Sequence, residues 1–270
     1  MSISSGLIQI DTWPVDMVAA GVTGPAATLG DHGKVGGACG LASVTKLLTA
    51  YAVLVAVEEG TMDLDEAAGP DGSTVRHLLS HASGLGPNGD VLGAPGRRRI
   101  YSNAGYEVLG IELAARSGIS FSEYLGEAVL SPLHMTRTCV DGSPAFSGVG
   151  TIQDLLAFGR ELLAPRLISP ETLSSATTVN FAGLDGVLPG FGRMKPNDWG
   201  LGFELRSNKS PHWTGTRNSL KTFGHFGASG TFLWVDPEVR LACVCLTNRE
   251  FGEWTFDRWP ALSDAVIGGR

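Results

Sequence analysis

Segments typical of β-strands occur at both ends of this 270-residue chain, and this placement restricts its topology more than any other feature. Near the N-terminus, residues 18–30 alternate apolar and small side chains around Gly24-Pro25, which predicts a hairpin. Strands from both ends of a chain can share one antiparallel sheet when the segment between them folds back. In the last quarter, strands are expected at 199–205, 221–225, 231–235 and 241–247, with a turn at 236–238.

The middle of the chain has patterns typical of helices. Residues 47–60 are apolar on nearly every side and end at Gly60, which predicts a buried helix of about four turns. The fold class is therefore α/β (α+β), with an antiparallel sheet built from both termini, flanked by helices, and a mainly helical insert. Further helices are expected at 74–79, 105–117, 121–129, 151–163 and 256–267. We expect one unit over 1–270, with an α/β region of about 1–60 plus 190–270 and a helical region of about 61–189.

The composition excludes several classes of protein. Hydrophobic residues make up 43% of the chain and charged residues 17%, whereas a disordered chain needs few apolar residues and a high net charge. The net charge of −7 argues against nucleic acid as a partner, and the three arginines at 97–99 are predicted to form a solvated turn. The longest apolar stretch, 47–57, is much shorter than the roughly 20 residues of a membrane span. We expect no membrane partner, no signal peptide and a cytoplasmic location.

The cysteines and acidic residues lack the spacing of metal ligands. Cys243 and Cys245 project to the same side of a predicted strand, so they cannot easily pair with each other. Asp63 and Asp65 are typical of a turn after a helix, and no phosphate loop occurs, so no metal and no cofactor is expected. Small buried side chains are predicted for all four cysteines, which are Cys39, Cys139, Cys243 and Cys245.

Ser43 and Lys46 form an S-x-x-K pattern at the start of the predicted buried helix. A helix places residues i and i+3 on one face, so the hydroxyl and the amine can meet. Among apolar groups the lysine loses solvation and its pKa falls, so it can act as a base at neutral pH. Such a base can activate a serine nucleophile.

Two more motifs follow in the chain. Tyr101-Ser102-Asn103 lies on a predicted loop before a helix, and His225-Phe226-Gly227 lies on a late strand. The order resembles that of S-x-x-K, S-D-N and K-T-G in serine β-lactamases and penicillin-binding proteins.

With these motifs the sequence resembles the serine β-lactamase-related family, which includes class C β-lactamases, D-alanyl-D-alanine carboxypeptidases, D-aminopeptidases and related esterases. The resemblance extends over about residues 36–249 and includes LASVTK, TVRHLLSHASGL, PGRRRIYSNAGYEVLGIELAARSG, PLHMTRT and GHFGASGT. It implies a β-lactamase/transpeptidase-like fold. It also implies that His77 and His81 are structural.

The resemblance implies a role for each motif residue. Ser43 corresponds to the nucleophile, and Lys46 to the lysine that shares its proton. Tyr101 corresponds to the general base or proton relay, and Asn103 to the amide that positions the substrate and the lysine. The backbone N–H groups of Ser43 and Ala228 would form the oxyanion hole that acyl transfer needs.

The third motif departs from the family pattern. His225 stands where lactam-cleaving members usually have lysine, and a neutral imidazole can donate to an ester oxygen but attracts a carboxylate weakly. Phe226 replaces a hydroxyl residue and is expected to narrow and dry the groove, while Gly227 is expected to let the substrate backbone approach. Lys221 cannot replace the missing lysine, because four strand residues span about 13 Å.

These observations predict a serine hydrolase that forms an acyl-enzyme through Ser43 and cleaves small esters or amides. A β-lactamase or D,D-peptidase is the alternative within the same class of enzyme. A catalytically idle binding protein with the same fold is the alternative outside it. The expected partner is a small ester, amide or lactam, and the oligomeric state is not predicted.

Overall fold

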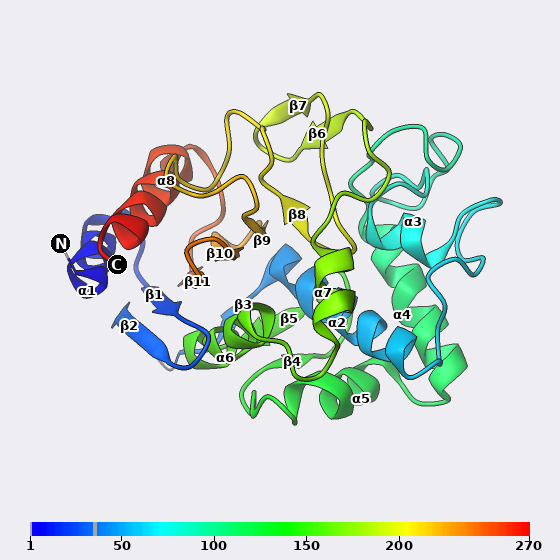
Figure 1. The fold of residues 1–270 in the computed structure, drawn as a ribbon, viewed down its shortest axis with the longest axis horizontal. Helices are drawn as coiled ribbons and strands as arrows, with labels where there is room; N and C mark the ends of the chain where they lie inside the picture. The colour runs from blue at the N-terminus through cyan, green and yellow to red at the C-terminus, as the bar shows by residue number, and fades with distance from the viewer. Residues whose placement is uncertain (1, 35–36) are drawn as a thin grey trace.

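The computed structural model describes residues 2–34 and 37–270, and its main element is a six-stranded antiparallel sheet (Figure 1). β1 (Val18–Thr23) pairs with β11 (Leu241–Thr247), which places Val18 opposite Thr247. This pairing confirms that both ends of the chain build one sheet. The other strands are β2 (Thr28–Gly33), β8 (Glu204–Leu205), β9 (Phe223–Gly227) and β10 (Thr231–Asp236), in the order β2-β1-β11-β10-β9-β8.

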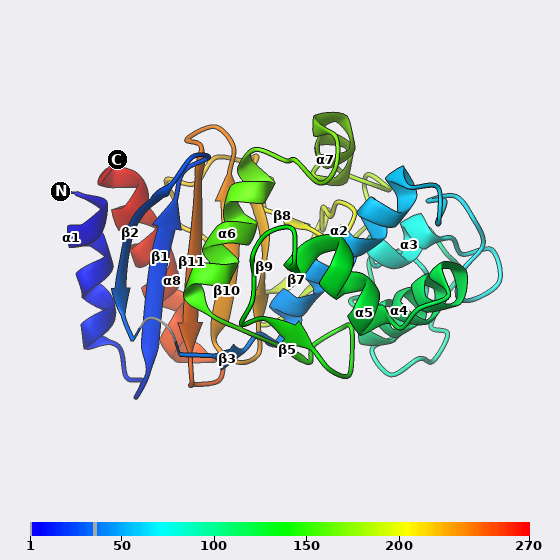
Figure 2. The same ribbon diagram turned by 90° about the horizontal axis from the view of Figure 1, so that it is seen from below.

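Helices cover both faces of the sheet (Figure 2). On one face, α1 (Ile3–Leu7), the 3₁₀ turn η1 (Ile8–Thr12) and α8 (Glu253–Gly268) enclose an aromatic-rich core. On the other face lies α6 (Ile152–Leu163), which packs closely on β1. A Cβ atom at Gly21 would lie 2.8 Å from a methyl carbon of Leu156, so this approach requires glycine. Because α1 and α8 pack together, the two ends of the chain lie side by side.

The central helix α2 (Thr45–Glu58) joins the sheet to the helical region. Residues 45–56 are all buried, as the apolar pattern predicted. The helix packs against α4 (Asn103–Ser117) and α5 (Phe121–Leu125), and it also contacts β9. Ser43 lies in the short 3₁₀ turn η2 (Ala42–Val44) immediately before it. This buried helix therefore fixes the position of the S-x-x-K motif.

The remaining helices agree with the predicted ranges within a few residues. α3 (Val75–Leu79) and α4 begin at side-chain caps, and the Ser102 hydroxyl of α4 accepts the Gly105 N–H at 3.0 Å. α5 continues as η3 (Gly126–Leu130), whereas α7 (Pro170–Ala176) was not predicted. Within the described part of the chain, no helix is both long enough and apolar enough to cross a lipid bilayer.

The strand predicted at 199–205 is mostly absent, because only the two residues of β8 pair with β9. Gly202 has a φ angle of +94°, so the backbone turns there instead of extending. A Cβ atom at Gly202 would lie 2.0 Å from the Cβ of Ala50, so α2 occupies the space that a side chain would need. Short strands that gave no periodic signal are β3 (Cys39–Gly40), β4 (Cys139–Val140), β5 (Gly148–Gly150), β6 (Gly186–Leu188) and β7 (Gly192–Met194).

Two predictions of burial were wrong. The arginine cluster is not a wholly solvated turn, because Arg99 is only 3% exposed while Arg97 and Arg98 are exposed. Backbone carbonyls surround the Arg99 guanidinium and supply the hydrogen bonds that water would otherwise make. Cys139 is exposed on the short strand β4, whereas the other three cysteines are buried as predicted.

Candidate active site

Ser43 and Lys46 meet at the start of α2. Ser43 follows Ala42, whose φ of +44° is unusual for a residue with a side chain and turns the chain sharply into the helix. Lys46 lies in the first turn of α2, and its Nζ atom is 3.3 Å from the Ser43 hydroxyl oxygen. The contact predicted from the i, i+3 spacing is therefore present.

Lys46 is fully buried, and its amine has two further partners. Nζ donates to Asn103 Oδ1 at 2.7 Å and to the Ala145 carbonyl at 2.9 Å. Burial lowers the pKa of Lys46 to about 7, although the negative charge of Glu107 opposes this change. A substantial fraction of the amine is thus neutral near pH 7 and can accept a proton from Ser43.

Tyr101 brings a phenol to the same point. It stands directly before the N-cap of α4, so the cap that starts the helix also sets the position of Tyr101 and Asn103. Burial raises the pKa of Tyr101 well above its ordinary value, and a hydrogen bond with Ser43 opposes that rise. Because burial raises its pKa, Tyr101 is protonated at neutral pH. Lys46 Nζ lies 4.8 Å from the centre of the Tyr101 ring.

His225 on β9 faces Tyr101, and its hydrogen bonds define its tautomer. Nδ1 is 2.6 Å from the Phe226 carbonyl oxygen, which can only accept, so Nδ1 carries the proton. Burial, helped by the charge of Lys46, lowers the pKa of His225 to about 3, so the ring is neutral and Nε2 is an acceptor. Nε2 lies 3.4 Å from the Tyr101 hydroxyl, which donates to it.

This tautomer corrects one expectation. The single N–H of His225 is used by the backbone, so His225 is not a donor to an ester oxygen of the substrate. The Tyr101 hydroxyl directs its own proton to His225 Nε2.

Phe226 does not narrow the groove, contrary to the prediction. Successive side chains of a strand point to opposite faces, so Phe226 projects away from His225 into the core beneath α8. Its ring centre is 5.1 Å from that of Phe251 and 5.8 Å from that of Trp259. The phenyl ring therefore stabilises the sheet–helix interface.

The turn after β9 is held against the segment that carries Ser43. A Cβ atom at Gly227 would lie 2.5 Å from the Leu41 carbonyl oxygen, so glycine is required by the protein's own backbone. The Ser229 hydroxyl donates to the Gly40 carbonyl at 2.7 Å, and the Thr231 hydroxyl donates to the Leu41 carbonyl at 3.1 Å. These contacts hold Ala228, between Gly227 and Ser229, beside the nucleophile segment.

Aromatic and backbone groups that the sequence did not reveal complete the site. The Trp199 ring is 6.0 Å from Tyr101 and 5.7 Å from His225, measured between ring centres. His81 packs 4.6 Å from the Tyr101 ring, measured between ring centres, and accepts the Ser102 N–H at 3.1 Å. Trp199 was assigned to a strand, and the Ala145 carbonyl has no sequence signature because every residue has one.

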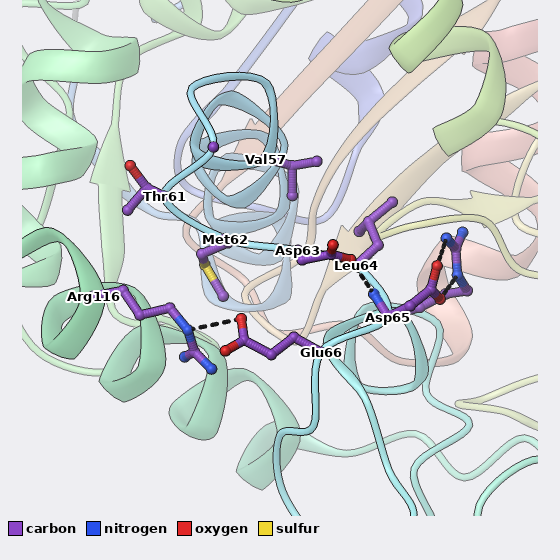
Figure 3. A pocket seen from close by; sticks show the side chains of 10 residues that line it. Val57, Thr61, Met62, Asp63, Leu64, Asp65, Glu66 and Arg116 are labelled. Carbon is purple, nitrogen blue, oxygen red and sulfur yellow. Dashed lines mark hydrogen bonds and ion pairs between the residues drawn. The ribbon is translucent and has the colours of Figure 1, made fainter.

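A cleft of about 750 Å³ lies at the C-terminal end of α2, away from Ser43 (Figure 3). Its charges pair with one another, since Arg116 lies 3.0 Å from Glu66 and Arg76 lies 2.7 Å from Asp65. Asp63 accepts the backbone N–H of Asp65 at 2.8 Å, which confirms the predicted turn. We assign no ligand to this cleft.

Known proteins match most of this chain in sequence and in fold. Residues 36–266 match the family model described as β-lactamase. The solved structure of a β-lactamase from Mycobacterium bovis is 54% identical and has a TM-score of 0.96, covering 97% of this chain and 98% of that one. EstCE1, described as a hydrolase with promiscuous acyltransferase activity, shares the fold at 18% identity and a TM-score of 0.79, covering 98% of this chain and 97% of its own.

A curated relative matches only part of the chain. Penicillin-binding protein 4* of Bacillus subtilis is 25% identical over 134 residues, which are 37% of this chain. The matched segment spans 30% of that relative's own length.

Proposed function

The chain belongs to the β-lactamase family, and from this premise we propose that it is a serine hydrolase that forms an acyl-enzyme through Ser43. The observation that carries the proposal is the 3.3 Å contact between the Ser43 hydroxyl and a buried Lys46 amine. The lowered pKa of that amine, about 7, supports its role as the base. Small esters and small amides are the proposed substrates.

In the first step, neutral Lys46 takes the proton of Ser43 as Oγ attacks the substrate carbonyl carbon. The N–H groups of Ser43 and Ala228 stabilise the negative oxygen of the tetrahedral intermediate. As the intermediate collapses, the bond to the leaving group breaks and the leaving alcohol or amine receives the proton from Lys46, directly or through Tyr101. Asn103 keeps the amine in place through its 2.7 Å contact.

In the second step, water attacks the acyl-enzyme and Lys46 accepts a proton from it. The collapse of this intermediate releases the carboxylic acid and returns the proton to Ser43. The net reaction consumes one ester or amide and one water, and no other reactant is needed.

Covalent labelling tests the mechanism. A fluorophosphonate probe should add once to the wild-type protein by intact-mass measurement, and peptide mapping should locate the adduct at Ser43. Ser43→Ala should lose both labelling and ester hydrolysis while its thermal unfolding stays unchanged. Wild-type turnover by Ser43→Ala would disprove the mechanism, and absence of labelling in the wild type would favour the idle binding protein.

A β-lactamase activity is the second candidate, because the 54% identical Mycobacterium bovis protein is described as one. The neutral His225 argues for esters, since it supplies no positive charge for a lactam carboxylate. A hydrogen bond to a charged partner stabilises a complex more than a neutral one does, so a lactam loses more binding energy than an ester when the positive charge is missing. The kcat/KM for p-nitrophenyl butyrate should therefore exceed that for nitrocefin by at least about tenfold. Equal values would put the lactamase first.

Cell fractionation tests the cytoplasmic location, which stays part of the proposal.

A further inference from the structure

A cleft of about 550 Å³ opens beside Tyr101, between two segments far apart in the sequence, residues 87–101 and 185–193. Its walls are largely apolar and include Pro87, Leu92, Ile100 and Val187. Tyr101 lines this cleft and also belongs to the reacting centre, since the centre of its ring lies 4.8 Å from Lys46 Nζ, which is 3.3 Å from the Ser43 hydroxyl oxygen. A group bound in the cleft therefore contacts a residue of the reacting centre.

Arg99 extends from the first wall of the cleft into the protein, where its side chain anchors that wall to neighbouring segments and its backbone contacts the second wall. Its guanidinium donates to the carbonyls of Ser80 at 2.6 Å, Asn180 at 2.8 Å and Asn197 at 3.1 Å. Its backbone N–H donates to the Asp185 carbonyl at 2.8 Å. A buried arginine with this many acceptors makes a rigid clamp, so the cleft is formed before any ligand binds.

Opposite the clamp, the mouth of the cleft carries apolar side chains. Leu92 is 49% exposed and Val187 is 58% exposed, on opposite walls. At the mouth, Arg193 lies 3.2 Å from Asp185, and Arg98 donates to the Leu92 carbonyl at 3.0 Å. Because its lining is largely apolar, the cleft is suited to an apolar group.

Resting on the proposed function, we propose that this cleft binds the acyl group of the substrate, an uncharged aliphatic chain of medium length, because its lining is largely apolar and its volume lies within the range of small-molecule sites. The acyl group is the half of an ester that stays bonded to Ser43 through both chemical steps. A cleft beside Tyr101 that holds this half can therefore stabilise the transition states of both steps. The preferred substrate is a medium-chain ester.

A series of p-nitrophenyl esters from acetate to octanoate tests this assignment. Full burial of one methylene would raise kcat/KM about fourfold. Because the cleft is open on one side, we expect half of that free energy, or about twofold per methylene. The six methylenes between acetate and octanoate then give about 60-fold. Val187→Trp, which fills the cleft from β6, should reduce the octanoate-to-acetate ratio to below about fivefold. Ile111→Trp is the matched control, since Ile111 is 66% exposed on α4 and does not line the cleft. It should keep the wild-type ratio.

Leu92→Asp gives an independent check if Val187→Trp folds poorly, because a carboxylate at the mouth should also lower the ratio. A flat acyl series in an active wild-type enzyme would overturn the inference and leave the proposed function intact. A rate that rises with the length of the alcohol in acetate esters, but not with acyl length, would also overturn it. Loss of all ester turnover together with absent labelling of Ser43 would overturn the proposed function itself.

Discussion

At the scale of single residues, the site depends on where three protons are held. Lys46 is buried enough to be partly neutral at pH 7, so it can take the proton of Ser43. Tyr101 keeps its own proton and directs it to His225, whose other nitrogen is occupied by the Phe226 carbonyl. This arrangement makes Lys46 the base and Tyr101 a relay, and the next two predictions separate these roles.

The first prediction concerns pH. Because only the neutral amine of Lys46 can accept a proton, kcat/KM should rise with pH and level off above an apparent pKa of about 7. Lys46→Arg, which stays charged at every accessible pH, should lose on the order of 10³-fold in activity. The pH profile of p-nitrophenyl butyrate hydrolysis measures both effects. A flat profile between pH 5 and 9 would show that another group is the base.

The second prediction compares two phenols. Tyr101→Phe should slow acylation by about 10²-fold, the usual loss when a positioned proton-transfer group is removed. Tyr106→Phe is the matched control, because its buried hydroxyl donates to the Leu79 carbonyl at 3.2 Å and not to Ser43. It should lower thermal stability slightly and leave the acylation rate near wild type. Stopped-flow acylation of both variants decides the matter, and equal rates would remove Tyr101 from the relay.

At the scale of elements, the approach of the β9–β10 turn to η2 decides where Ala228 lies. Gly227→Ala places a Cβ against the Leu41 carbonyl oxygen, so the turn must move away from Ser43. Loss of one oxyanion donor costs about 10²- to 10³-fold in kcat, which is the expected effect. Gly126→Ala is the control, since nothing lies within 4 Å of the added atom there. An unchanged kcat in Gly227→Ala would argue against Ala228 as a donor.

At the scale of the whole molecule, buried histidines link stability to pH. Burial lowers the pKa values of His81, His212 and His225, so the folded protein leaves these rings neutral. In the unfolded chain they bind protons below about pH 6.5, and the unfolded state is then favoured. Stability is therefore fully present above pH 6.5 and is lost as the pH falls.

The expected loss is about 1.4 kcal/mol per pH unit for each ring whose folded pKa lies far below the pH, which holds for His81 and His225, or about 3 kcal/mol per unit for these two together below pH 6. Denaturant unfolding at pH 7.5, 6.0 and 5.0 measures it. His212→Gln should make the slope shallower, because the pKa of this ring is also lowered in the folded protein. The same free energy of unfolding at pH 7.5 and 5.0 would contradict the prediction.

Local patterns in the sequence determined the sheet made from both termini, the buried helix α2 and the meeting of Ser43 with Lys46. Each depends on a period or spacing within one segment, and the helix or strand geometry carries it directly into three dimensions. The order of the motifs also led to Tyr101 and Asn103, which the cap of α4 then placed beside Lys46.

Only the tertiary structure decided the side that Phe226 faces, the tautomer of His225 and the contact of Ala145 with Lys46. It also decided that Arg99 is a buried clamp and that its two flanking segments form a cleft. These features depend on backbone carbonyls and on contacts between residues up to about a hundred positions apart. Backbone atoms have no sequence signature, and long-range contacts leave no local period, so the sequence alone could not reveal them.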